Sequence, residues 1–448
     1  AAGQYKLFDS VQKANQKAPL EKTQYDKELI KADERVNVMY MTFMGDFLKI
    51  YPKPRDPNNS WYSPKKAMDM FEAKDSEMIK LITTNYFVQL EEAAKTNNWK
   101  KANDGLAFIK EYQEVVGTKI IPSKDKIDFE IFYNDFDLFA KLVPYYLAIG
   151  ILLIVFAFIH MIKPIIKINW ILTTATVLLG MGFLVHTTGL GIRWYITDHA
   201  PWSNAYESIV FIALTTVLAG LILARKSVFA LSATAILAGA TMGVAHMSFI
   251  NPEITPLVPV LKSYWLMIHV ALIVGGDGFL GLGFILSLLA LMLFVFRTKN
   301  NMRIDRSIAE LSALSEMSII VGLAIFTIGN FLGGVWANES WGRYWGWDPK
   351  ETWAAVTIVV YAAVIHLRFI PKLKSHYLFN LAALWAYSSV LMTYFGVNYY
   401  LSGLHSYAAG DPMPIPDWVY IAIAVAFVLS VISFFKRDSK VKLNCEKI

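Results

Sequence analysis

The chain has 448 residues, of which 55% are hydrophobic and only 17% are charged, and its mean hydropathy is +0.40. These values exclude an ordinary soluble domain and indicate a membrane protein. The net charge of +6 comes from short basic connections between apolar runs, so we expect no nucleic-acid partner. The single cysteine, Cys445, excludes a disulfide framework and a CxxC redox pair within the chain.

The first part of the chain, residues 1–141, is rich in Lys, Glu and Asp, and apolar residues recur at helical spacing within 64–116. This pattern predicts a mainly helical domain outside the membrane. Trp61 and Tyr112 are expected in the core of this domain, and contact with a partner is the alternative for both. Such a domain requires a signal peptide or a preceding span, and the sequence opens with Ala-Ala-Gly-Gln and offers neither. We therefore expect the chain to be a piece of a longer protein.

Apolar runs of roughly 20 residues, long enough to cross a bilayer as helices, follow from Leu142 onward. They predict an all-α polytopic membrane protein with about nine transmembrane helices, in contact with membrane lipid. The runs cover about 142–162, 168–190, 205–224, 228–250, 262–296, 316–338, 351–370, 377–401 and 417–435.

The basic residues between these runs alternate in number and predict the orientation of the protein. Alternate connections are rich in them: Lys163 and Lys167; Arg225 and Lys226; Arg297, Lys299, Arg303 and Arg306; Arg368, Lys372 and Lys374; Lys436, Arg437, Lys440 and Lys442. The other connections carry few: Arg193, Lys262, Arg343 and Lys350. This asymmetry predicts a cytoplasmic C-terminus, and it places residues 1–141 and the connection around Arg343 on the outer face.

Four tryptophans fall within the thirteen residues 341–353, between two apolar runs. They are Trp341, Trp345, Trp347 and Trp353, interspersed with Arg343, Asp348, Lys350 and Glu351. An interfacial aromatic belt explains tryptophans at a membrane boundary. It does not explain a glycine-rich, charged loop in which Pro349 is placed to start a helix. The pattern instead favours a binding surface for a flat, apolar ligand that carries charge at its edge, such as a porphyrin with two propionates.

Two of the eight histidines are predicted to lie near this surface. The run 262–296 would be about 52 Å long as a helix, against a hydrocarbon core of about 30 Å. Because Arg297 fixes its inner end, His269 is expected at or above the outer boundary. His405 lies in a later outer connection. Neutral imidazole is a common axial ligand of haem iron, and six-coordinate haem takes two such ligands.

Other polar residues receive separate interpretations. His366 lies 13 residues after Trp353 on one predicted helix, about 20 Å deeper, so it cannot bind the same iron. An ionisable group at that depth is a functional candidate. Ser203 and Asn204 are both candidates to cap a helix. Asp277, in Gly-Gly-Asp-Gly, is expected to mark a close or irregular helix contact.

The segment WGRYWGWDPKETW (341–353) resembles the WWD motif of the haem-handling proteins of cytochrome c maturation. Together with HAPWSNAYES (199–208) and HSYAAGDP (405–412), it is similar to the CcsA (ResC) half of the system II cytochrome c synthases. The resemblance implies an eight-helix haem-handling domain at 168–436 with its WWD loop at 339–353. Residues 1–141, as a periplasmic domain, and the span 142–162 resemble the end of the CcsB (ResB) half, and 437–448 form a cytoplasmic tail. The whole is similar to the C-terminal part of a fused CcsBA synthase.

The resemblance implies a function in the bacterial inner membrane, with the site facing the periplasm. Haem b would be attached through thioether bonds to the CxxCH motif of apocytochrome c, and the N-terminal CcsB-like half would be a further partner. The implied catalytic residues are His269, His405, Trp341, Trp345, Trp347 and Asp348. Haem binding would also involve Arg343, Trp353 and His366. His269 and His405 are the implied axial ligands, and His366 belongs to a second, inner haem position whose other ligand lies in the CcsB half. Arg343 or Lys350 would pair with propionates.

Two alternatives remain open. A haem exporter or chaperone would present haem without catalysing ligation, and outer histidines do not separate it from a synthase. A membrane cytochrome b for electron transfer usually carries paired ligands at matched depths on facing spans, whereas only His366 is clearly embedded here.

Overall fold

The computed structural model describes residues 5–17, 22–118, 120–163, 168–247, 250, 252–254, 257, 261–298, 301–401, 403 and 415–437. The chain forms two compact units, Ala1–Lys124 and Asp125–Ile448. Nearly all of the regular structure is helical in both.

The first unit combines five helices with one short antiparallel strand pair in which Tyr51 opposes Tyr62. Its elements are α1 (Phe8–Gln16), α2 (Gln24–Phe43), β1 (Tyr51–Pro52), β2 (Trp61–Tyr62), α3 (Pro64–Met70), α4 (Ala73–Thr96) and α5 (Lys100–Val116). The main core of this unit includes Tyr51, Phe71, Ile79 and Tyr112. The Tyr112 hydroxyl donates to the Pro52 carbonyl at 3.3 Å, so the predicted core position of Tyr112 is confirmed.

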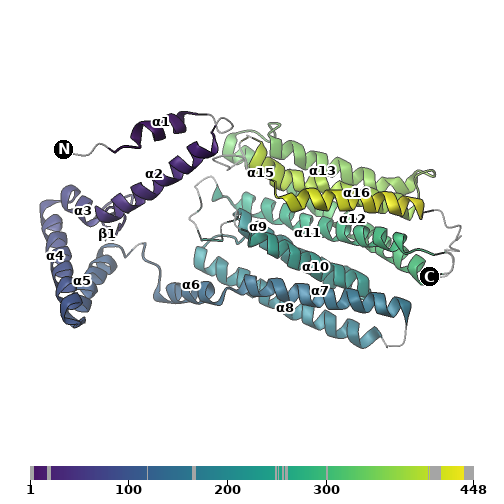
Figure 1. Ribbon diagram of the computed structural model, residues 1–448, viewed down its shortest axis with the longest axis horizontal. Coiled ribbons are helices and arrows are strands. Elements are labelled where there is room, and N and C mark those ends of the chain that lie inside the picture. The colour runs from purple at the N-terminus through teal and green to yellow at the C-terminus, as the bar shows by residue number, and fades with distance from the viewer. Residues whose placement is uncertain are drawn as a thin grey trace. The chain divides into compact units, whose positions relative to one another are not determined.

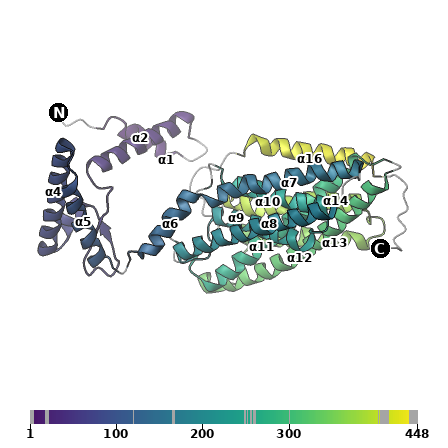
Figure 2. The ribbon, with the colours of Figure 1, turned by 90° about the horizontal axis from the view of Figure 1, so that it is seen from below.

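The second unit is a helical bundle whose long helices run side by side in both views (Figures 1 and 2). Its first elements are α6 (Lys124–Phe136), α7 (Leu138–Ile162), α8 (Ile168–Thr197), α9 (Ala205–Leu223), α10 (Val228–Ala245) and α11 (Tyr264–Val295). They are followed by α12 (Met302–Trp341), α13 (Pro349–His366), η3 (Leu367–Phe369), α14 (His376–Leu391), η4 (Met392–Gly396), α15 (Val397–Tyr400) and α16 (Asp417–Phe435). Helix α16 lies at the edge of the bundle (Figure 2) and packs on α11 and α14.

Within the described residues, nine helical segments are long and apolar enough to cross a membrane, which confirms the predicted polytopic all-α fold. Two features of these helices were not predicted. Helix α12 begins at Met302 rather than near residue 316, because Asn301 caps it and Ile304 and Ile308 bury the apolar side of its charged first turns. The eighth span contains a π-helical segment, Met392–Gly396, between α14 and α15. Such segments widen a helix locally and are frequent at functional sites.

Helix α11 packs most extensively against α12, and glycines bring the two backbones together. A Cβ at Gly276 would lie 2.9 Å from the Phe326 Cβ and 3.1 Å from the Gly322 carbonyl oxygen. On its other side, a Cβ at Gly278 would lie 2.9 Å from the Thr216 amide nitrogen of α9. The Gly-Gly-Asp-Gly sequence therefore marks a close helix contact, as predicted, within a regular helix.

We predict that Gly276→Ala lowers the melting temperature of the purified protein. Alanine has the higher helix propensity, by roughly 1 kcal/mol, but the added methyl meets the Cβ of Phe326 and a backbone oxygen, which rotamer changes cannot move. Such overpacking costs about 1–3 kcal/mol. The matched control is Gly180→Ala in α8, where nothing lies within 4 Å of the added Cβ. Thermal unfolding in detergent should show a lower melting temperature for Gly276→Ala only. Equal melting temperatures would contradict the close contact.

Candidate functional site

A cavity of about 530 Å³ lies at the end of the bundle where α9, α11 and α13 begin and α12 ends. We call this the cavity end. The volume falls within the range of about 300–1,000 Å³ that is typical of small-molecule sites. The wall is mainly apolar, with a few polar side chains. The lining residues include Trp202, Leu266, His269, Asp277, Trp336, Trp345, Lys350 and Asn398.

His269 is held in a defined orientation in the cavity wall. Its Nδ1 lies 2.7 Å from the Gly329 carbonyl oxygen, which is one turn before Gly333 on α12. Its ring lies nearly parallel to the buried indole of Trp336, at 12° and 6.4 Å between centroids. A bond from Nδ1–H to a carbonyl fixes the tautomer that presents Nε2 to a metal. The ring orientation therefore suits an axial ligand.

Gly333 leaves the space that the His269 ring occupies. A Cβ added at this position would lie 2.5 Å from Cε1 and 2.7 Å from Nδ1 of the imidazole. The ring is already fixed by Gly329 and Trp336, so it could not move aside without losing those contacts. The close contact of α11 with α12 thus extends to the histidine itself.

The Trp-rich segment, residues 339–353, connects α12 to α13 by two helix-terminal motifs. Gly342 ends α12 with a φ of +70° and donates its N–H to the Asn338 carbonyl. Asp348 and Glu351 form a capping box at the start of α13, with Pro349 as its first residue. This confirms the prediction that Pro349 starts a helix. Trp347 also has a positive φ, 57°, which is uncommon for a bulky residue and directs the chain into the cap.

The tryptophans of this segment have different environments. Trp345 lines the cavity, whereas Trp341 packs edge-on against Trp336 at 4.8 Å between centroids. Trp347 is 75% exposed and lies perpendicular to Trp345. Trp347 and Trp353 are not among the residues that line the cavity. The segment therefore contributes one indole directly and a second indirectly, through Trp336.

The charged side chains are also divided. Arg343 lies 3.7 Å from the Glu351 carboxylate and does not line the cavity. Lys350 does line it, and its Nζ donates to the Asn398 side-chain oxygen at 3.1 Å. Asp277 lines the cavity too and is only 4% exposed. A ligand in the cavity thus meets Lys350 rather than Arg343.

His405, predicted as the second outer ligand, lies outside the described residues, as do Cys445 and all of the HSYAAGDP sequence. The chain is described up to Leu401 and again at Gly403. A Cβ at Gly403 would lie 2.4 Å from a carboxylate oxygen of Asp348 and 2.9 Å from Cδ of Pro349. The residue two positions before His405 therefore packs on the first turn of α13.

His366 ends α13, whose 18 residues span about 27 Å. Its Nδ1 lies 2.7 Å from the Ala362 carbonyl oxygen, the ring is exposed, and it does not line the cavity. The structure thus separates His366 from His269, and its assignment to a second haem position stays a prediction. Across the described part of the chain, no three His, Cys, Asp or Glu side chains converge to hold a bare metal ion.

Comparison with known proteins gives the family. Residues 202–405 match the family described as Cytochrome C assembly protein. The chain is 36% identical over 238 residues to the cytochrome c biogenesis protein CcsA of Chlamydomonas reinhardtii, covering 52% of this chain and 67% of that protein. It is 34% identical over 268 residues to CcsA of Prochlorococcus marinus, covering 52% and 83%. The chain belongs to the CcsA family of cytochrome c biogenesis proteins. All of the cavity-lining residues, from Trp202 to Tyr399, lie within the matched segment.

A further relative extends beyond this region. Protein NrfI of Wolinella succinogenes is 42% identical over 433 residues, which cover 97% of this chain and 48% of NrfI. The chain therefore spans about half the length of that relative. The similarity includes the first unit as well as the CcsA-type region, because nearly the whole chain is aligned.

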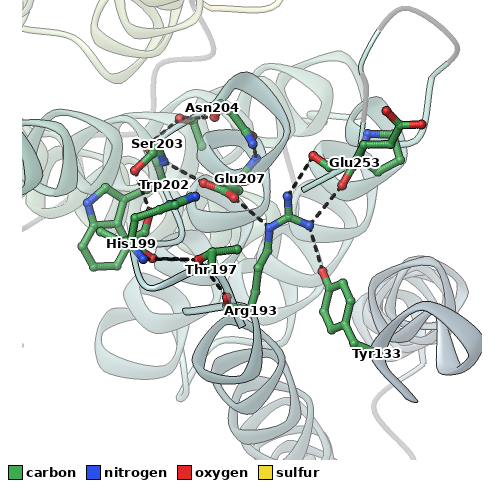
Figure 3. A network of polar contacts seen from close by, with 12 residues as sticks. Tyr133, Arg193, Thr197, His199, Trp202, Ser203, Asn204, Glu207 and Glu253 are labelled. Carbon is green, nitrogen blue, oxygen red and sulfur yellow. Dashed lines mark hydrogen bonds and ion pairs between the residues drawn. The ribbon is translucent and has the colours of Figure 1, made fainter. Parts of the chain in front are cut away.

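Beside the cavity, a buried ion pair fixes the loop that carries Trp202 (Figure 3). Arg193 of α8 and Glu207 of α9 are joined at 2.7 Å and are 1% and 0% exposed. The other Glu207 oxygen accepts from the Ser203 amide at 2.8 Å, and of the two predicted candidates it is Asn204 that caps α9. Trp202 in turn donates its indole N–H to the Met267 carbonyl at 3.0 Å, two residues before His269.

The guanidinium of Arg193 also reaches α6 and the segment before α11. It donates to the Tyr133 hydroxyl at 3.2 Å and to the Pro252 carbonyl at 3.1 Å, and Figure 3 shows it between Tyr133 and Glu207. A buried charge needs such a complete set of partners, since an unpaired one costs several kcal/mol. Arg193 therefore ties α6, α8, α9 and the chain near residue 252 into one support for the cavity wall.

The sequence analysis missed Trp336, Asn398 and the pairing of Arg193 with Glu207. Trp336 had a usable signal, because it lies three residues after Gly333 and five before Trp341 on one helix. Arg193 and Glu207 lie 14 residues apart on different helices, and no spacing rule connects them. Trp202 was noted only within its motif.

We predict that Glu207→Gln lowers the melting temperature strongly, because it leaves the buried Arg193 without its counter-ion, at a cost of about 3–5 kcal/mol. Removing both charges in Arg193→Gln/Glu207→Gln should recover part of this loss. Glu316→Gln is the matched control, since Glu316 pairs with Arg368 at a half-exposed site. Exposed pairs contribute about 0–1 kcal/mol. Thermal unfolding measures all three variants. A wild-type melting temperature for Glu207→Gln would show that the pair is not a structural support.

Proposed function

We propose that the cavity holds haem b and that the protein attaches it to the CxxCH motif of apocytochrome c. The observation that carries this proposal is the convergence of His269, Trp336 and Trp345 on one cavity, in a chain of the CcsA family. An oriented imidazole can ligate iron, and the indoles can pack against the flat apolar ring.

The residues present fit a haem. His269 offers Nε2 because Nδ1 is directed to the Gly329 carbonyl. Apolar lining residues such as Leu266, Val270 and Ile273 suit the porphyrin face, and Lys350 is a cation for a propionate. Trp341 supports Trp336, and Asp348 fixes the turn that carries Trp345. Arg343 and Glu351 brace that turn; Glu351 lines the cavity, whereas Arg343 does not.

The reaction that we propose is the addition of a thiol to a vinyl group. A carbon–sulfur bond forms, the vinyl π bond breaks, and the thiol proton ends on the other vinyl carbon, so no oxidant or reductant is consumed. The chain needs to supply no nucleophile for this step. Its contribution is to hold the ring so that two thiols of one peptide meet two vinyl groups, which raises their effective concentration. This requirement explains a rigid cavity wall with an oriented histidine.

His405 is proposed as a second histidine that would hold the haem iron. Supporting this, Gly403 packs on Asp348 and Pro349, so the chain enters the segment of His405 beside the Trp-rich segment. His366, at the other end of α13, is proposed for a separate haem position on the way to the cavity. Trp347 and Trp353 are proposed to contact haem or apocytochrome outside the described cavity.

The proposed setting is a bacterial inner membrane, with the cavity facing the periplasm and the C-terminus in the cytoplasm. The charge distribution of the connections supports this orientation. A CcsB-like half is the proposed partner, because the related NrfI is about twice the length of this chain. A haem carrier that presents haem without ligation is the competing function.

Co-expression with an apocytochrome c that bears one CxxCH motif tests the proposal. The chain is produced together with its proposed CcsB-like half, and the haem that stays on the cytochrome after denaturation is measured. We expect covalently attached haem on the cytochrome with the unaltered protein. With His269→Ala the amount should fall at least tenfold, since loss of the imidazole ligand misplaces the porphyrin ring.

His246→Ala is the matched control. This histidine also bonds a backbone carbonyl, that of Met242, at 2.8 Å, but it does not line the cavity. It should leave covalent haem unchanged. Transfer of haem without a thioether bond would support the carrier instead. Equal losses with both histidine variants would remove the assignment of His269.

A further inference from the structure

The cavity wall contains a buried carboxylate, one oxygen of which has no hydrogen-bond partner among the described residues. Asp277 lies on α11, eight residues and about 12 Å beyond His269 toward the middle of the bundle. It lines the cavity and is 4% exposed. Within the described residues, its Oδ1 has no hydrogen-bond partner. Buried carboxylates are normally satisfied, so an unsatisfied one that faces a cavity points to a ligand or a mobile counter-ion.

Lys350 is the cation that faces Asp277. Both side chains line the cavity, and Asp277 and Asp348 are the carboxylates that act on the Lys350 ammonium electrostatically. Among the described residues, Lys350 forms no ion pair with Asp277 or Asp348. Its Nζ instead donates a hydrogen bond to the neutral side-chain amide of Asn398. An ammonium has three donors, so two are left for another acceptor.

The neighbouring cation does not compete for this role. Arg343 is directed to Glu351 and lies outside the cavity wall. Among the described lining residues, Lys350 is therefore the only Lys or Arg. A buried ammonium in an apolar wall gains most from an anion that it can bind directly, because the low local dielectric strengthens the interaction.

We infer that Lys350 and Asn398 form a carboxylate-binding subsite in the cavity wall, and that Asp277 is the internal counter-ion that Lys350 faces when no ligand is bound. The ligand class is a flat apolar molecule with a carboxylate at its edge. This inference rests on the proposed function, in which that carboxylate is a haem propionate. Asp277 then disfavours tight binding, since a ligand carboxylate has to compete with it for Lys350.

Two probes separate the carboxylate from the rest of the ligand: ferric haem, and its dimethyl ester, in which both propionates are neutral. Affinity is measured by spectroscopic titration of the 448-residue chain in detergent. The unaltered chain should bind haem about tenfold to a hundredfold more tightly than the ester, as expected for a charge-assisted hydrogen bond. Lys350→Met should remove this preference and leave the affinity for the ester unchanged, which also shows that the cavity has folded.

Asp277→Asn keeps the shape of the side chain and removes its charge, so it should increase the affinity for haem several-fold. When combined with Lys350→Met, Asp277→Asn should leave the haem affinity unchanged, because Asp277 weakens haem binding only by competing for Lys350. Arg343→Met is the matched control, a nearby cation outside the cavity, and should keep the preference for haem.

The inference is overturned if tighter binding of haem than of its dimethyl ester persists in Lys350→Met, or if it disappears in Arg343→Met. A weaker affinity for haem in Asp277→Asn, or an equal gain with and without Lys350, contradicts the counter-ion role. Equal binding of haem and ester by the unaltered chain removes the subsite but leaves the haem cavity. Binding of neither probe contradicts the proposed function itself.

Discussion

The close contact between α11 and α12 is the constraint on which the cavity depends. Lipid gives no hydrophobic driving force for helix association, so packing and interhelical hydrogen bonds must provide it. Gly276 and Gly322 let the two backbones approach, and Gly333 continues the contact at the cavity end. The same approach brings the Gly329 carbonyl to His269 Nδ1. Helix association and orientation of the histidine are therefore one structural feature.

Buried polar groups at the cavity end fall into two kinds. Arg193 and Glu207 are buried but hydrogen-bonded to each other and to Ser203, Tyr133 and Pro252. Such a satisfied network fixes structure. Asp277 is equally buried, faces the cavity, and has an oxygen with no partner in the described chain. The contrast separates the support of the wall from the groups that remain available to a ligand.

Much of the fold could be predicted because its signals are local. Span length needs only the sequence, and Asn204 and Pro349 follow helix-capping chemistry. The structure places His269 in the cavity wall, and its predicted depth in the membrane stays a prediction. In contrast, the start of α12 was missed, because its first turns are charged and still pack inside the bundle.

The candidate site was less predictable, because contacts between helices decide it. Trp345 and Trp347 look equivalent in the sequence, yet a positive φ at Trp347 leaves only Trp345 in the cavity wall. The role of Trp336 in the site becomes visible only in the structure, where its indole stacks on the His269 ring. Arg343 and Lys350 were equal candidates for a propionate, and the contact of Arg343 with Glu351 distinguishes them. His405 lies outside the described residues, so its role stays a prediction.

The central claim is that the cavity binds haem through His269. Absorption and electron paramagnetic resonance spectra of ferric haem bound to the full chain test it most directly, when recorded for the unaltered protein and for His269→Gly with and without imidazole. We expect a low-spin spectrum for the unaltered protein, loss of that spectrum in His269→Gly, and its recovery on addition of imidazole, which fills the space of the missing ring. An identical spectrum in the unaltered protein and in His269→Gly without imidazole would contradict it.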